Sequence, residues 1–176
     1  MTSADETSSA LEIPLREIES HVAANGWDQP VRLFALVDTH QLLEQQPDLR
    51  ATIGGVADVP MLTSVEQDNL PKHDDLTDLL AQLSWPPSVE GVAVVAERIV
   101  LPADRDTQLP SDPQQARSMA IADPNAHDLR VAAAATRSGD RFCLLRLREY
   151  DDDKTLVAGP DLMVGLTDLI HTSLTT

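Results

Sequence analysis

Three arginines in the C-terminal half have the chemistry and spacing of an anion-binding site. Arg146 and Arg148 lie two residues apart in a run with β-strand character, so their side chains are expected on one face. Arg98 lies on another predicted strand. If these strands are neighbours, three guanidinium groups line one surface, where they can bind carboxylates or other anions in a two-pronged geometry. Arg98, Arg146 and Arg148 are therefore the candidate binding residues.

The competing interpretation is that these arginines are paired locally. Glu97, Glu149 and Asp151 lie beside them in the sequence, and a salt bridge to each would leave a solvated, charged end of the sheet. If the site is instead catalytic, the candidate bases are Asp128 and Glu97. The choice depends on whether the arginines converge on a pocket or on carboxylates.

The chain contains no established catalytic, nucleotide-binding or metal-binding motif. It lacks both glycine-rich phosphate loops, the zinc motif H-E-x-x-H and the nucleophile motif G-x-S-x-G. The one cysteine, Cys143, lies in an apolar run and is predicted to be a core residue rather than a reactive thiol. The run Asp151-Asp152-Asp153 lacks the spacing of a calcium loop. We therefore expect no cofactor and no metal.

The charge balance limits the possible partners. With 29 acidic and 13 basic residues, the formal net charge is −16, which repels nucleic acids and anionic membranes. A basic protein partner is compatible with this charge. No apolar run is long enough to span a bilayer, and the first ten residues have no signal-peptide pattern, so we expect a cytoplasmic protein.

The apolar pattern predicts a disordered leader over residues 1–10 and a single globular domain over residues 11–176. The fold class is α/β or α+β, with helices packed on a mixed sheet of about four or five strands. Ser138-Gly139-Asp140 predicts the turn of a C-terminal β-hairpin. The expected strands cover residues 31–37, 62–66, 89–101, 129–136 and 141–150, and the expected helices begin near residues 13, 38, 73, 112 and 159.

Several phrases resemble a known family. They are LSWPPSVEGVAVVAERIVLP at residues 83–102, LTSVEQDNLP at 62–71, LRLR at 145–148 and GPDL at 159–162. Together they resemble a family of small acidic proteins of actinobacteria with no assigned biochemical activity, over residues 15–174. The resemblance implies an actinobacterial, cytoplasmic origin and carries over no catalytic residue.

Two functional hypotheses follow from the residues. The first is a non-enzymatic, accessory or chaperone-like module that binds another protein through its acidic surface. The second is an enzyme or binder of a small anionic ligand that uses Arg98, Arg146 and Arg148. A homodimer formed through the final strand or helix is compatible with either hypothesis.

Overall fold

The fold is built on an open six-stranded sheet with the strand order β2-β1-β3-β4-β5-β6, and the computed structural model describes residues 10–49, 62–100 and 127–175. Every neighbouring pair of strands is antiparallel. Of the two predicted classes, α/β and α+β, the structure has the α+β class; the sheet is antiparallel rather than mixed and has more strands than predicted. The strands are β1 (Arg32–Asp38), β2 (Leu62–Glu66), β3 (Val89–Val100), β4 (His127–Thr136), β5 (Arg141–Leu147) and β6 (Val157–Gly159).

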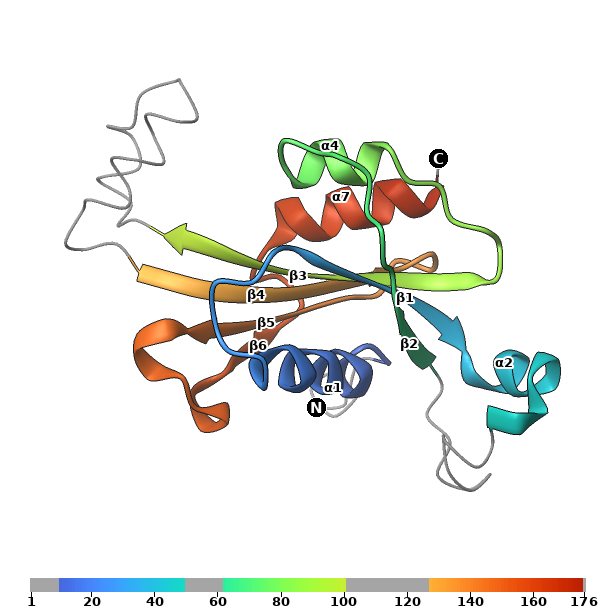
Figure 1. Ribbon diagram of the computed structural model, residues 1–176, viewed down its shortest axis with the longest axis horizontal. Coiled ribbons are helices and arrows are strands. Elements are labelled where there is room, and N and C mark those ends of the chain that lie inside the picture. The colour runs from blue at the N-terminus through green and yellow to red at the C-terminus, as the bar shows by residue number, and fades with distance from the viewer. Residues whose placement is uncertain (1–9, 50–61, 101–126, 176) are drawn as a thin grey trace, which may run out of the picture.

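Helices cover both faces of this sheet (Figure 1). Helix α1 (Glu12–Ala23) packs on one face through an apolar stripe that includes Leu15, Ile18 and Val22. Helices α4 (Leu76–Ala81) and α7 (Val164–Thr175) pack on the other face. The short α2 (Thr39–Gln45) follows β1 at the end of the sheet. No helix in the described ranges combines the length and the apolar character that crossing a bilayer requires.

Small side chains let the central strands and the helices approach closely. Ala132, Ala133, Ala134 and Ala135 of β4 are all fully buried between the two helix layers. Gly91 of β3 faces the same strand, and a Cβ atom there would lie 2.8 Å from the main-chain oxygen of Ala135. The centre of the sheet is therefore packed on both faces, as the apolar sequence of β3 predicts.

The sequence located most described elements but missed β6. The β4–β5 hairpin is confirmed, and Gly139 in its turn has the positive φ of 102° that favours glycine. Helix α4 is shorter than predicted and begins after Asp75, whose side chain accepts the N–H of Asp78 as an N-cap. The predicted helix at 112–122 and almost all of the predicted leader lie outside the described residues.

Candidate functional site

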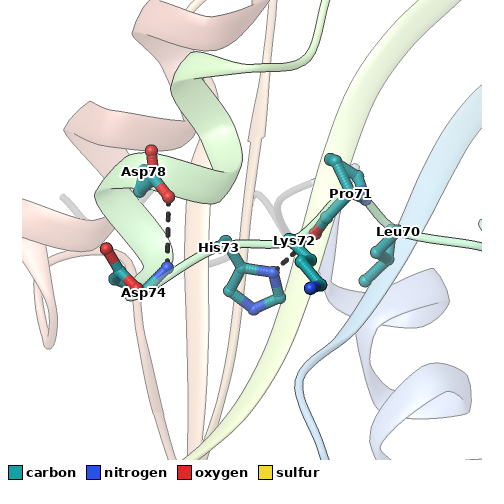
Figure 2. A pocket seen from close by; sticks show the side chains of 6 residues that line it. All are labelled: Leu70, Pro71, Lys72, His73, Asp74 and Asp78. Atoms are coloured by element: carbon teal, nitrogen blue, oxygen red, sulfur yellow. Dashed lines mark hydrogen bonds between the residues drawn. The ribbon is translucent and has the colours of Figure 1, made fainter.

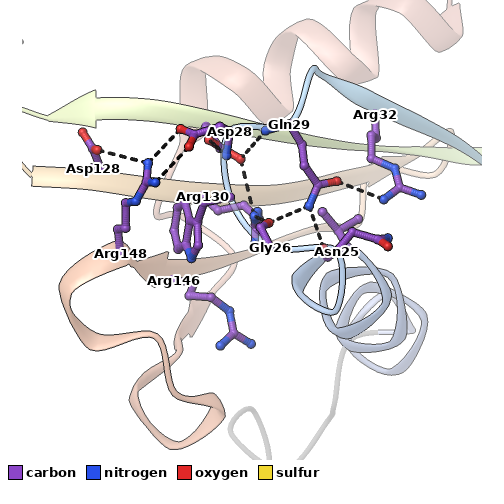
Figure 3. Close-up of polar contacts among 12 residues, drawn as sticks. Asn25, Gly26, Asp28, Gln29, Arg32, Asp128, Arg130, Arg146 and Arg148 are labelled. Atoms are coloured by element: carbon purple, nitrogen blue, oxygen red, sulfur yellow. Dashed lines mark hydrogen bonds and ion pairs between the residues drawn. The ribbon is translucent and has the colours of Figure 1, made fainter.

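Two parts of the described structure have features of a functional site. One is a surface pocket of 590 Å³ beside α4 (Figure 2), with an apolar hollow next to it. The other is a network of charged side chains between α1, its following loop and the sheet (Figure 3), which contains two of the three predicted arginines.

The predicted arginines do not all lie on one face. Arg146 projects from β5 toward α1, and Arg148 follows in a 3-10 helix. Arg98 is exposed and alternates with Glu97, which lies on the α1 face, so Arg98 belongs to the opposite face. Strand β4 also separates β3 from β5. The condition for the expected grouping is therefore not met by Arg98, and Arg130 of β4, directly opposite Arg146, lies in the network.

Arg146 is locked to helix α1 by a buried ion pair. Its Nε and Nη2 atoms each donate to a carboxylate oxygen of Glu19 at 2.7 Å. The Arg146 side chain is 3% exposed and the Glu19 side chain 1% exposed. Nη1 of Arg146 also donates to Asp151 at 3.0 Å. This guanidinium group therefore fastens α1 and the segment after β5 to each other.

Arg130 is almost fully enclosed beneath the indole of Trp27. Its guanidinium carbon lies 4.3 Å from the centre of the Trp27 ring, and its side chain is 1% exposed. Nη2 donates to the main-chain oxygen of Gly26 and lies 3.4 Å from Glu97. Nε and Nη1 are buried and have no hydrogen-bond partner in the described structure. Stacking on the indole offsets part of the cost of burying this charge.

The loop after α1 is held by further contacts. The Glu97 carboxylate accepts the main-chain N–H groups of Asp28 at 2.9 Å and Gln29 at 3.0 Å. Arg148 donates to both carboxylate oxygens of Asp28, at 2.9 and 3.0 Å, and these bonds hold the pKa of Asp28 below its usual range. Asp28 has a φ of 64°, a conformation that these contacts stabilise.

Asp151 completes this network at the indole N–H of Trp27. It accepts the indole N–H of Trp27 at 3.0 Å, and this bond is the main cause that holds the pKa of Asp151 below its usual range. Arg146 lowers the same pKa by a second hydrogen bond. In this network three guanidinium groups face five carboxylates. We call it the arginine clamp, which consists of Glu19, Trp27, Asp28, Glu97, Asp128, Arg130, Arg146, Arg148 and Asp151.

The apolar hollow has a volume of 340 Å³ and lies over β1 on the α4 face of the sheet. The segment after β2 passes β1 on its way to α4 (Figure 1), and it forms one wall of the hollow. The indole N–H of Trp85 in another wall is buried, and no hydrogen-bond partner for it exists in the described chain. The floor consists of Leu33, Ala35, Val37 and Val89, and the walls consist of Val65 and residues 67–71 and 83–86.

Acidic groups lie in the wall of this hollow and in the neighbouring pocket. Leu70 and Pro71 line both the hollow and the pocket of Figure 2. Asp68 lies in the wall of the hollow, and Asp74 and Asp78 line the neighbouring pocket, where Asp78 accepts the N–H of Asp74 at 3.1 Å. Of the residues that line these two spaces, all within the described chain, only Lys72 is a lysine or arginine. The sequence predicted an acidic surface for protein binding but gave no sign of the hollow.

Comparison with protein-family models identifies the family of this chain. The model of the PPA1309-like proteins matches residues 11–175, which is nearly the whole chain. The chain belongs to this family. The match agrees with the resemblance to an uncharacterised family. The matched residues of this PPA1309-like protein include both the arginine clamp and the apolar hollow. No curated protein and no solved structure matches the sequence.

The positions of the other candidate residues in this PPA1309-like protein disfavour thiol and metal chemistry. Cys143 is fully buried in the core, and burial raises the pKa of its thiol, which disfavours the reactive thiolate. Within the described ranges, no three His, Cys, Asp or Glu side chains are grouped so that they could hold a metal ion. The contacts of the clamp join α1, its following loop and the sheet to one another, so they are those of a structural network.

Proposed function

We propose that this PPA1309-like protein is a non-enzymatic binding module that holds a segment of another protein at the apolar hollow over β1. The observation that carries the proposal is a 340 Å³ apolar cavity beside an edge strand, with Val65 of that strand 43% exposed in its wall. Apolar cavities of this size bind ligands and anchor side chains, and exposed strand edges bind extended segments.

The negative charge of the molecule favours a partner segment with basic residues. The net charge of −16 and the carboxylates Asp68, Asp74 and Asp78 near the hollow favour a segment that carries basic residues. The same charge disfavours association with another copy of this chain. A cytoplasmic location and an actinobacterial origin belong to this proposal and rest on the composition and the resemblance.

The competing hypothesis, a binder of small anions, has less support from the contacts. Arg146 and Arg148 would have to release Glu19 and Asp28 before they could hold a ligand in a two-pronged geometry. Arg98 lies on the other face. An anion would also meet five carboxylates in the same network.

The test is affinity purification of the tagged protein from its native cells at low and high salt, with mass spectrometry of the bound proteins. The variant carries Asp68→Asn and Asp74→Asn, and a control of equal charge carries Glu17→Gln and Glu44→Gln, both on exposed helix positions. We expect one stoichiometric partner that high salt and the aspartate variant release and that the control retains. The absence of any partner above background contradicts protein binding, and equal loss from both variants contradicts docking at the hollow.

A further inference from the structure

Among the described residues, no strand other than β1 pairs with β2, so β2 is an edge strand of the described sheet. Gln67 N–H donates to the main-chain oxygen of Leu33 at 2.8 Å, so this pair is a hydrogen-bonded pair of the β1–β2 ladder. Hydrogen-bonded and non-bonded pairs alternate in an antiparallel ladder. Ser64 and Glu66 are therefore in non-bonded positions, and their N–H and C=O groups point away from β1 toward the free edge.

The side-chain geometry connects this edge to the hollow. Val65 pairs with Ala35, and both side chains face the hollow on the α4 side of the sheet. Residues directly opposite each other on neighbouring strands share a face of the sheet. A residue of an added strand opposite Val65 would thus direct its side chain to the side on which the hollow lies.

Resting on the proposed function, we infer that the occupant is an extended peptide segment that adds to the sheet as a strand beside β2. Its main chain pairs with the N–H and C=O groups of Ser64 and Glu66, and one large apolar side chain opposite Val65 enters the hollow. Basic residues on either side of this anchor are attracted to Asp68 and Asp74. The edge gives affinity and the hollow gives selectivity for the anchor, as in other cases of strand addition.

The two tryptophans provide a direct measurement of this binding. The chain has only Trp27 and Trp85, so an NMR spectrum of the indole N–H groups contains two signals, and Trp85→Phe assigns them. Trp85 lines the hollow, whereas Trp27 lies in the arginine clamp on the other face of the sheet. The probe is an acetylated and amidated peptide, Thr-Lys-Thr-Leu-Thr-Lys-Thr, in which the leucine and both lysines lie on the same face of a strand.

We expect this peptide to shift the Trp85 signal at saturation and to leave the Trp27 signal in place. Replacing its central leucine with alanine, or its lysines with glutamates, should weaken binding by about tenfold or more. Raising the salt from roughly 50 mM to roughly 500 mM should also weaken it. Equal binding of the alanine peptide, stronger binding of the glutamate peptide, or no shift of Trp85 with any peptide of the set overturns the inference.

A proline tests the edge itself. Ser64→Pro removes an N–H group that points away from β1, which an edge strand tolerates, and Ser64→Ala is the matched control. We expect Ser64→Pro to weaken the peptide by about tenfold or more while Ser64→Ala binds as the unaltered chain does. The same peptide with N-methyl groups at alternate residues tests the pairing without altering the protein. Undiminished binding of the N-methylated peptides in both alternate registers contradicts strand addition.

The outcomes separate this inference from the proposed function. If a captured natural partner is retained by Ser64→Pro and by Trp85→Phe, protein binding stands and the docking mode is wrong. If small apolar molecules alone shift Trp85 and Ser64→Pro leaves their affinity unchanged, the hollow is a small-molecule site and the peptide inference is wrong.

Discussion

The buried ion pair between Glu19 and Arg146 should make a large contribution to stability. Glu19→Gln removes the charge and leaves the Arg146 side chain, which is 3% exposed, with Asp151 at 3.0 Å as a remaining carboxylate partner. Breaking one partner of a buried pair costs about 3–5 kcal/mol. Because Asp151 is 47% exposed and still compensates part of the charge, we expect the lower end, a loss of about 3 kcal/mol in the free energy of unfolding.

The assay is thermal and urea unfolding followed by circular dichroism. For a chain of this size, a loss of about 3 kcal/mol lowers Tm by roughly 6–12 °C. The control is Glu12→Gln, which breaks the exposed pair between Glu12 and Arg16 at 3.7 Å and should cost less than about 1 kcal/mol. Combining Glu19→Met with Arg146→Met should recover much of the loss, because an apolar pair leaves no buried charge. A loss below about 1 kcal/mol for Glu19→Gln would refute the clamp as a stabilising device.

Three further predictions concern the core and the clamp. Gly91→Ala should lower the free energy of unfolding by about 1–3 kcal/mol in urea titrations, because the new Cβ would lie 2.8 Å from the Ala135 oxygen; unchanged stability would contradict that contact. Cys143 should react with a thiol reagent only at the rate of unfolding, and fast labelling of the native protein would contradict its burial. Trp27→Phe should raise the pKa of Asp151, measured by carboxyl NMR titration, because it removes the indole donor. Because that pKa is lower in the folded than in the unfolded state, its stabilising contribution is present above about pH 4 and is lost as the pH falls through the folded-state value; the variant should lose less stability on acidification, and an equal loss would contradict this assignment.

The strands were predictable where the local sequence determines them. Strand β2 has the bounds that its apolar residues predict, and the turn at Gly139 determines the β4–β5 register. That register places Arg130 opposite Arg146, so Arg130 could have been found from the hairpin alone. Glu19 was also readable, because it lies four residues after Leu15 on the buried stripe of α1.

Other features depend on contacts between distant segments. Arg98 is apart from Arg146 and Arg148 because it lies on the opposite face and because β4 separates β3 from β5, and the strand order is not encoded in either strand. The three residues of β6 carry no periodic signal and are ordered by pairing with β5. The hollow arises from the path of residues 67–71 above β1, which no pattern in these residues predicts.

The most direct test of the central claim is site-specific photo-cross-linking in cells that express the protein. A benzophenone amino acid replaces the exposed Ser84 in the wall of the hollow, and the control replaces Glu17 on the exposed side of α1. We predict that Ser84 yields one discrete adduct with another protein, that Glu17 does not yield it, and that Asp68→Asn with Asp74→Asn abolishes it. A protein adduct from Glu17 with none from Ser84 would contradict the hollow as the binding site.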